Sequence, residues 1–274
     1  MLEVLKNHAD GFAPHQRMNA TREYLQWIIL QLLDDTGYRK HLAFTGGTCL
    51  RVVFGIGRFS EDLDFSLVQP KGFDLRALNE AVLRRLELMG LAAESSPAKD
   101  KNTVGSFSLK FAGVLQHLGL SPMKSEKLSI KFEVDTRPPA GGVVSEFLFQ
   151  EPILFMINHF DLPSLFATKI HALLFRGYDK GRDYYDLFFY LRKKTLPSLS
   201  LFQAAVKQTH PQLNFPSLDS VFTAIRKKLS EADEKKILRD VGPFLLDPGE
   251  ERFLKKDVLL MSLRQAYASK TGTA

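Results

Sequence analysis

Asp62 and Asp64 are the residues whose spacing most directly indicates chemistry in this sequence. They lie in the segment RFSEDLDF, residues 58–65, where apolar and acidic residues alternate near the end. Side chains at positions i and i+2 of a strand share a face, so both carboxylates would project in the same direction. Two neighbouring carboxylates repel each other unless a cation lies between them, and a divalent metal is the usual cation. The pair therefore predicts a metal site.

Gly46, Gly47 and Thr48 lie upstream, between a short apolar run and helix-compatible residues that continue to Phe54. This order predicts a strand, a glycine turn and a helix, followed by further turns and then the acidic strand. Backbone N–H groups at such a turn and helix start suit triphosphate oxygens, and the Thr48 hydroxyl can add a donor. The segment therefore predicts a phosphate-binding element next to the metal site.

A second acidic strand is predicted over residues 128–135, where apolar and polar residues alternate without interruption. Glu133 and Asp135 fall on its polar face. An edge strand facing solvent would show the same alternation, so the pattern alone leaves both arrangements open. Carboxylates from two neighbouring strands can hold two Mg²⁺ ions, one activating an attacking hydroxyl and one steadying a leaving pyrophosphate. Either Glu133 or Asp135, or both, would then serve as the third carboxylate of a nucleotidyl-transfer site.

A helix with an unusual stripe is predicted after Asp161-Leu-Pro163, a sequence typical of a helix start. Its stripe, spaced by four, three, four and three residues, contains Leu162, Phe166, Lys169, Leu173 and Arg176. Lys169 and Arg176 therefore share a face with core residues. They either extend their charges out to solvent or point at a carboxylate-lined cleft.

The next predicted helix carries Asp183 and Asp186 in its first turn. Carboxylates at this end of a helix are stabilised by the helix dipole, which would explain either residue without catalysis. A functional role for the pair is the alternative.

The remaining pattern defines the fold class. Helices are predicted within residues 1–40 and over 73–89, and a strand over 103–111, whereas the composition from residue 151 onward is helical. We therefore predict an α/β (α+β) protein. A mixed-sheet domain that carries the predicted nucleotidyl-transfer site would span residues 1–150, and a mainly helical domain that completes the cleft would span residues 151–274.

The composition is that of an ordinary globular protein, with 45% hydrophobic and 25% charged residues among 274. No apolar run approaches the roughly 20 residues that cross a bilayer, and residues 1–10 lack the features of an export signal. The single cysteine, Cys49, excludes an internal disulfide and is expected to be a small buried thiol. We therefore expect a cytoplasmic protein without membrane contact. Its net charge of +6 is compatible with an acidic partner such as nucleic acid.

Three segments, taken in order, resemble the AbiEii/AbiGii toxin family, a branch of the polymerase-β-like nucleotidyltransferase superfamily. The first is FTGGTCL (44–50) with RFSEDLDF (58–65), and the second is KFEVDTRPP (131–139). The third is ATKIHA (167–172) with Arg176 and KGRDYYDL (180–187). The resemblance covers about residues 40–192.

The resemblance implies the toxin of a bacterial toxin–antitoxin or phage-defence pair, with a separate antitoxin protein as partner. Related toxins use an NTP and add nucleotides to RNA, including the acceptor ends of tRNA. Asp62, Asp64 and Glu133 would bind Mg²⁺, with Asp135 as a further candidate ligand. Lys169 would contact the triphosphate, and Asp183 would be an essential polar residue nearby. The nucleotide-binding residues implied are Gly46, Gly47, Thr48, Arg58, Ser60 and Lys169.

Two other functions remain compatible with the sequence. The same fold could transfer a nucleotide to a protein or to a small molecule such as an antibiotic. It could also serve as a non-catalytic module that binds RNA or a partner protein, although Asp62, Asp64 and Glu133 argue against this. The identity of the acceptor separates these functions.

Overall fold

The computed structural model describes residues 1–100, 103–123 and 125–267, which form two compact units. Unit 1 comprises residues 1–138 and 144–159, and unit 2 comprises residues 139–143 and the chain from Phe160 onward. The functional division predicted at residue 150 stays a prediction. The terminal residues 269–274, whose end is expected to fray, lie outside the described residues.

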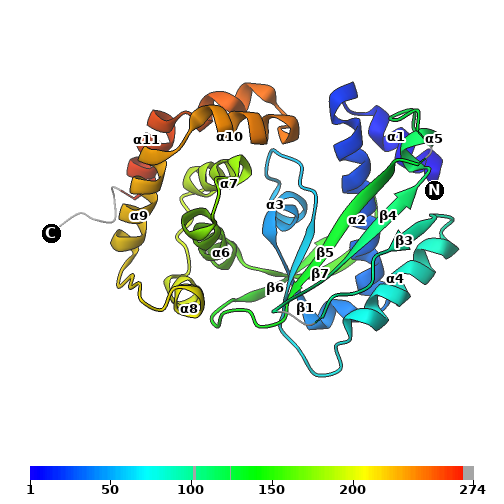
Figure 1. The fold of residues 1–274 in the computed structure, drawn as a ribbon, viewed down its shortest axis with the longest axis horizontal. Coiled ribbons are helices and arrows are strands. Elements are labelled where there is room, and N and C mark those ends of the chain that lie inside the picture. Colours follow the sequence, from blue (N-terminus) through cyan, green and yellow to red (C-terminus); the bar gives the residue numbers. More distant parts are fainter. Residues whose placement is uncertain (101–102, 124, 268–274) are drawn as a thin grey trace. The chain divides into compact units, whose positions relative to one another are not determined.

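A seven-stranded mixed sheet is built by the described residues of unit 1, in the order β3-β4-β5-β2-β1-β7-β6. β1 pairs antiparallel with β2 and parallel with β7, and β2 pairs parallel with β5. Figure 1 shows β4 and β5 side by side, and β4 pairs antiparallel with both β3 and β5. The bounds are β1 (Leu42–Thr45), β2 (Leu63–Leu67), β3 (Ala93–Ser95), β4 (Val104–Ala112), β5 (Lys127–Asp135), β6 (Val144–Phe149) and β7 (Phe155–Phe160).

The helices predicted within residues 1–40 and 73–89 are confirmed. The helical segments of unit 1 are α1 (Leu2–Asp10), η1 (Pro14–Gln16), α2 (Arg17–Asp35), η2 (Tyr38–His41), α3 (Gly46–Phe54), α4 (Leu75–Leu88) and α5 (Val114–His117). The start of α4 is fixed by Asp74, whose carboxylate accepts hydrogen bonds from the N–H groups of Arg76 and Ala77. Its end is followed by Gly90, which has the left-handed φ of 72° that glycine adopts at little cost.

One face of the sheet is apolar and is packed by phenylalanines from neighbouring strands. Phe44 stacks on Phe65, Phe65 on Phe132, and Phe132 on Phe107, with ring centroids 4.7–5.1 Å apart. Helices cover this apolar face: Trp27 of α2 contacts Phe149, and α3 meets His159, the register partner of Phe44. The opposite face is therefore the one that carries the polar side chains of the strands.

We call this opposite side the polar face. It carries Asp64 and Ser66 of β2 and the side chains of β5 and β4 that point in the same direction. On β5 they are Lys131, Glu133 and Asp135, and on β4 they are Ser106, Ser108 and Lys110. The alternation predicted for residues 128–135 is thus confirmed. β5 lies between β4 and β2, so the alternative of an edge strand is wrong.

The helical composition expected from residue 151 onward is wrong for residues 155–160, which form β7 inside the sheet. Four of the six residues of β7 are buried, so its sequence, FMINHF, lacks the regular alternation of a strand with one wet face. A short apolar run of this kind cannot be distinguished from a buried helix by periodicity.

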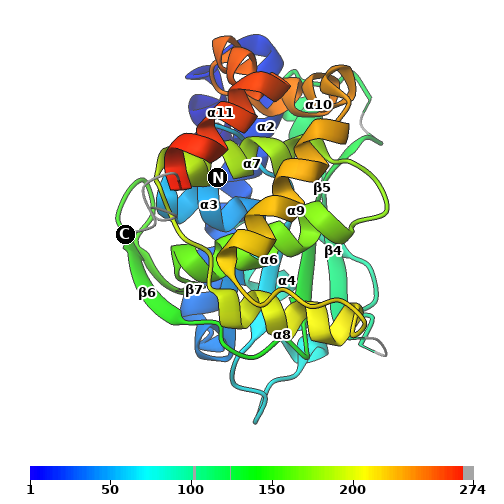
Figure 2. The ribbon, with the colours of Figure 1, turned by 90° about the vertical axis from the view of Figure 1, so that its left-hand side faces the viewer.

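The mainly helical composition predicted for this part of the chain is confirmed: apart from Phe160, the last residue of β7, the described elements of unit 2 are helices. They are α6 (Leu162–Phe175), α7 (Gly181–Arg192), α8 (Leu199–Thr209), α9 (Leu218–Glu231), α10 (Glu234–Val241), η3 (Gly242–Phe244), η4 (Pro248–Leu254) and α11 (Lys256–Tyr267). Figure 2 shows α6 beside α7 and α8, and α7 also contacts α10 and α11. The predicted start of α6 is confirmed by Asp161, whose side chain caps Ser164 N–H. Within the part of the chain that the structure describes, no helix is both long enough and apolar enough to span a bilayer.

Candidate functional site

Asp64 and Glu133 are neighbours on the polar face of unit 1. β2 and β5 run parallel, and the Cα of Asp64 is paired with that of Glu133. Side chains of directly paired residues project from the same face of a sheet, so the two carboxylates point the same way. Asp62 precedes the first residue of β2, two positions before Asp64. The sheet therefore brings one carboxylate from β5 beside the acidic end of β2.

Gly46 and Gly47 follow β1 directly as the first two residues of α3, and the left-handed φ of Gly46, 73°, makes the turn between the strand and the helix. A Cβ on Gly46 would lie 2.2 Å from Asp64 Oδ2, and one on Gly47 would lie 2.6 Å from Arg58 Nη2. Ser60 Oγ would also lie 2.8 Å from the Gly47 Cβ. Glycine is thus required at both positions, because the side chains of Asp64, Arg58 and Ser60 lie against the start of α3 where a Cβ would be.

Gly46→Ala is expected to be more destabilising than Gly55→Ala. Both glycines have a left-handed φ, 73° and 69°, which costs a non-glycine residue about 1–2 kcal/mol. Gly55 has no atom within 4 Å of its added Cβ, whereas the Cβ at Gly46 would displace the Asp64 carboxylate. Urea unfolding of both variants measures the difference, and equal midpoints would contradict the crowding at Gly46.

The loop that leads to Asp62 is held by three side chains. The Thr48 hydroxyl donates to the Asp62 carbonyl, and the buried Arg58 donates from Nη1 to the Phe59 carbonyl at 2.9 Å. Gln26 of α2 donates from Nε2 to the carbonyls of Ser60, at 3.1 Å, and Glu61, at 2.9 Å. The Thr48 proton is therefore used within the loop, and Gln26 is a positioning residue that the sequence did not indicate.

The electrostatics of the polar face include a cation that the sequence analysis did not single out. Lys131 Nζ lies 2.7 Å from Glu133 Oε1, and the pKa of Lys131 is raised by this hydrogen bond and by the charges of Asp62 and Asp64. The alternation of residues 128–135 already places Lys131 and Glu133 on one face, and this is the sequence signal from which the lysine could have been found. Among the described residues, no three His, Cys, Asp or Glu side chains lie close enough together to hold a metal ion.

Asp135 and Cys49 lie near this site in more enclosed surroundings. The Asp135 carboxylate accepts a hydrogen bond from Arg137 N–H at 2.9 Å, while burial raises its pKa. Its Cα partner on β2 is Ser66, whereas Asp64 is paired with Glu133. Cys49 is fully buried, and burial followed by the Asp64 charge raises the pKa of its thiol well above the usual range. The expectation of a small buried thiol is confirmed.

In unit 2, the charged residues predicted on α6 and α7 meet in one cluster. Lys169 Nζ lies 2.9 Å from Asp183 Oδ1 and 2.9 Å from Asp186 Oδ2, and Arg176 Nη1 lies 3.0 Å from Asp183 Oδ2. The Lys169 side chain is only 15% exposed, so it does not extend into solvent. Asp183 and Asp186 are both paired with these cations. Only Asp183 lies in the first turn of α7, so the first-turn position predicted for Asp186 is wrong and the helix dipole does not account for that residue.

Lys180 adds positive charge to this region. Burial lowers its pKa, and the charges of Arg182, Arg176 and Lys169 lower it further, whereas Asp183 raises it. An anion near these side chains would relieve their mutual repulsion. The cluster therefore has the electrostatic character that a phosphate-contacting element needs.

His171 is expected to make the stability of the protein fall as the pH falls. Burial, and then the charge of His210, lowers its pKa below 6.5, and its Nε2 is 2.8 Å from Thr209 Oγ1. Below pH 6.5 the unfolded chain therefore binds a proton at this position more readily than the folded chain. Urea unfolding between pH 7 and pH 5 should show a smaller loss of stability for His171→Gln than for the wild type. Equal losses would contradict this role.

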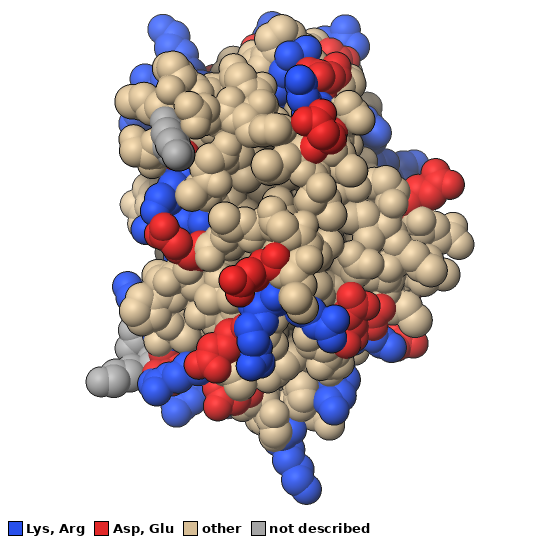
Figure 3. All heavy atoms as spheres, turned by 90° about the vertical axis from the view of Figure 1, so that its right-hand side faces the viewer, with Lys and Arg blue, Asp and Glu red and all other residues tan. Residues whose placement is uncertain are grey.

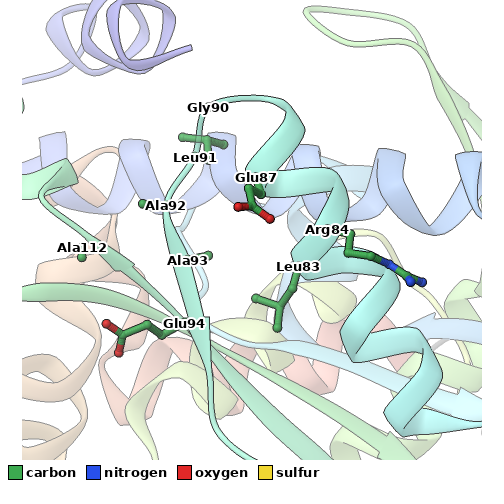
Figure 4. A pocket seen from close by; sticks show the side chains of 9 residues that line it. All are labelled: Leu83, Arg84, Glu87, Gly90, Leu91, Ala92, Ala93, Glu94 and Ala112. Atoms are coloured by element: carbon green, nitrogen blue, oxygen red, sulfur yellow. The ribbon is translucent and has the colours of Figure 1, made fainter.

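Of two other surface features, the first is lined by none of the predicted site residues. A hollow of about 620 Å³ lies between α4 and β3. Figure 4 labels its lining residues, of which Arg84, Glu87 and Glu94 are charged. Figure 3 shows a face on which basic and acidic side chains lie intermingled around a broad area of other residues. Over the described residues of that face, the positive charge is not gathered into one patch.

Comparisons with known proteins identify a family and a shared fold. The sequence profile of the family described as nucleotidyl transferase AbiEii toxin, type IV toxin–antitoxin system, matches residues 28–256. A crystal structure of an H. pylori protein provisionally named a nucleotidyltransferase has 20% identity and a TM-score of 0.55, covering 90% of this chain and 94% of that one. The structure of JHP933 from Helicobacter pylori has 20% identity and a TM-score of 0.53, covering 92% of each chain. These two likenesses show a shared fold. No protein of curated function matches the sequence.

Proposed function

The chain belongs to the AbiEii family of nucleotidyltransferase toxins, and from this premise we propose that it transfers a nucleoside monophosphate from an NTP to RNA, with tRNA as the acceptor. The family resemblance predicted from three sequence segments is thereby confirmed, as is the class of enzyme. Membership of a type IV toxin–antitoxin family implies an antitoxin partner. The observation that carries the proposal is the pairing of Asp64 with Glu133 beside the glycine start of α3.

Asp62, Asp64 and Glu133 are the proposed metal ligands. Since no three such side chains among the described residues are close enough to hold an ion as they stand, metal binding would have to draw these carboxylates together. Their oxygen donors suit Mg²⁺, and the absence of a Cβ at Gly46 leaves the space in which the Asp64 carboxylate lies. Glu133 is preferred over Asp135 because it is the register partner of Asp64 and because Asp135 is engaged by Arg137 N–H. Bound there, the metal would supply positive charge to the phosphates and lower the pKa of the acceptor hydroxyl. Nucleotidyltransferases generally use an NTP and a divalent metal.

The chain's own groups bind and orient the substrate in this proposal. Backbone N–H groups of Gly46 and Gly47 face phosphate oxygens, and Arg58 and Ser60 stabilise this end of α3. Lys169, with Arg176 and Lys180, supplies positive charge to the triphosphate, and Asp183 holds Lys169 in place. In the reaction, a bond forms between the acceptor oxygen and the α-phosphorus as the bond to pyrophosphate breaks.

RNA is the proposed acceptor because the protein has a net charge of +6 and because its family contains toxins. The test is to incubate the purified protein with Mg²⁺, each α-labelled NTP in turn, total tRNA and a cell extract. Label is expected in the tRNA fraction with one preferred NTP. If label is found only in protein or in small molecules, the acceptor is not RNA but a molecule of that fraction. If no fraction is labelled, a non-catalytic binding module is favoured.

A binding module and an active enzyme also differ in their response to ligand. An NTP with Mg²⁺ that binds only the folded state must raise the melting temperature. A rise without transfer would point to a missing acceptor, whereas no rise would contradict the nucleotide site itself.

A further inference from the structure

Lys131 places a cation among the carboxylates proposed to bind metal. Its ammonium lies 2.7 Å from Glu133 Oε1 and within the electrostatic influence of Asp62 and Asp64. Its Cα partner on β4 is Ser108, and that of Glu133 is Ser106, so β4 adds no charge at these two positions. Lys131 therefore acts directly on the acidic group of β2 and β5.

The pair between Lys131 and Glu133 is open to exchange with ions from solvent. The side chains are 48% and 28% exposed, so a cation from solution can reach the Glu133 carboxylate. A divalent ion and an ammonium on the same carboxylate repel each other at such distances. Occupation of Glu133 by one cation thus opposes occupation by the other.

We propose that Lys131 is a tethered counter-cation of the metal site, balancing the carboxylates before metal binds and giving up Glu133 when a divalent ion arrives. This inference rests on the proposed function, because it takes Asp62, Asp64 and Glu133 to be the metal ligands. It explains why the acidic residues of two strands are tolerated together without a metal. It also predicts that removing Lys131 strengthens metal binding, the opposite of what loss of a supporting residue would do.

The test measures Mn²⁺ binding to the full chain without nucleotide, by the electron paramagnetic resonance of the free ion. Lys131→Met keeps the apolar stem and removes the charge, and it should bind Mn²⁺ roughly tenfold more tightly than the wild type. Lys131→Arg keeps the charge and should bind like the wild type. Lys110→Met removes a lysine from the same polar face at a different register position, and should also bind like the wild type.

Thermal unfolding gives a second readout. Lys131→Met should melt at a lower temperature than the wild type without metal, and should gain more from Mn²⁺. Unchanged or weaker Mn²⁺ binding by Lys131→Met would overturn the inference. The variant Glu133→Gln separately tests the premise that Glu133 is a metal ligand. If Glu133→Gln loses the binding that Lys131→Met leaves unchanged, only the role of Lys131 is wrong. If Mn²⁺ binding in both the wild type and Lys131→Met is independent of Glu133 and Asp64, the proposed metal site is wrong as well.

Discussion

Asp64→Asn is expected to reduce nucleotidyl transfer by at least about 10³-fold, because it removes charge from the position where two strands and the start of α3 converge. Asparagine has nearly the same shape, so the sheet pairing with Glu133 is expected to survive. The measurement is the initial rate of label transfer from NTP to tRNA, together with the melting temperature of each variant. A large loss of rate in a normally folded protein would assign the chemistry to this residue.

The matched control is Glu94→Gln. Glu94 is paired with Lys110, so it belongs to the polar face, but its side chain is 65% exposed and bound to Lys127 at 2.6 Å. Loss of its charge should leave the transfer rate within about twofold of the wild type, as for surface substitutions in general. Equal transfer by Asp64→Asn and Glu94→Gln would show that the site has been assigned to the wrong carboxylates.

Lys169→Met is expected to lower the free energy of unfolding by about 3–5 kcal/mol, because it leaves buried carboxylates without their shared cation. Asp186 is 0% exposed and Asp183 is 3% exposed, so neither can recover its hydration without opening the contact between α6 and α7. Arg176 remains as a partner for Asp183. Urea unfolding measures the loss.

A second substitution distinguishes a role of Lys169 in packing α6 on α7 from a role in binding the nucleotide. Lys169→Met with Asp186→Asn removes a buried charge of each sign and should recover most of the lost stability. If the double variant is stable yet shows no rise in melting temperature with NTP and Mg²⁺, Lys169 contacts the nucleotide. If the rise is restored, the lysine serves the packing of α6 on α7. Failure of the double variant to regain stability would contradict the burial argument.

Periodicity predicted those parts of the fold in which one side of an element differs from the other. β5 alternates over its whole length, and α6 has a regular stripe, so the polar positions at Glu133 and Lys169 could be found from the sequence. β7 gave no such signal because its first three residues, FMI, are all apolar and four of its six residues are buried. The pairing of Asp64 with Glu133 also required the structure, since the register of two strands about 70 positions apart is set by packing and not by either sequence alone.

The specific contacts of individual polar side chains could not be predicted from the sequence either. Lys131 was visible only as one polar residue in an alternating run, and its ion pair with Glu133 depends on side-chain direction. Thr48 was expected to face phosphate, but a hydroxyl can donate one hydrogen bond, and the Asp62 carbonyl receives it. The identity of a donor can thus be predicted more readily than its partner.

Gln26 has a practical consequence for anyone who dissects this protein. The family profile begins at residue 28, inside α2, whereas the amide that supports the carbonyls of Ser60 and Glu61 belongs to residue 26. A recombinant fragment trimmed to 28–256 would cut α2 within its buried length and delete this support for the approach to Asp62. An inactive fragment of that kind would say nothing about the carboxylates, because limits of sequence similarity differ from those of the folding unit.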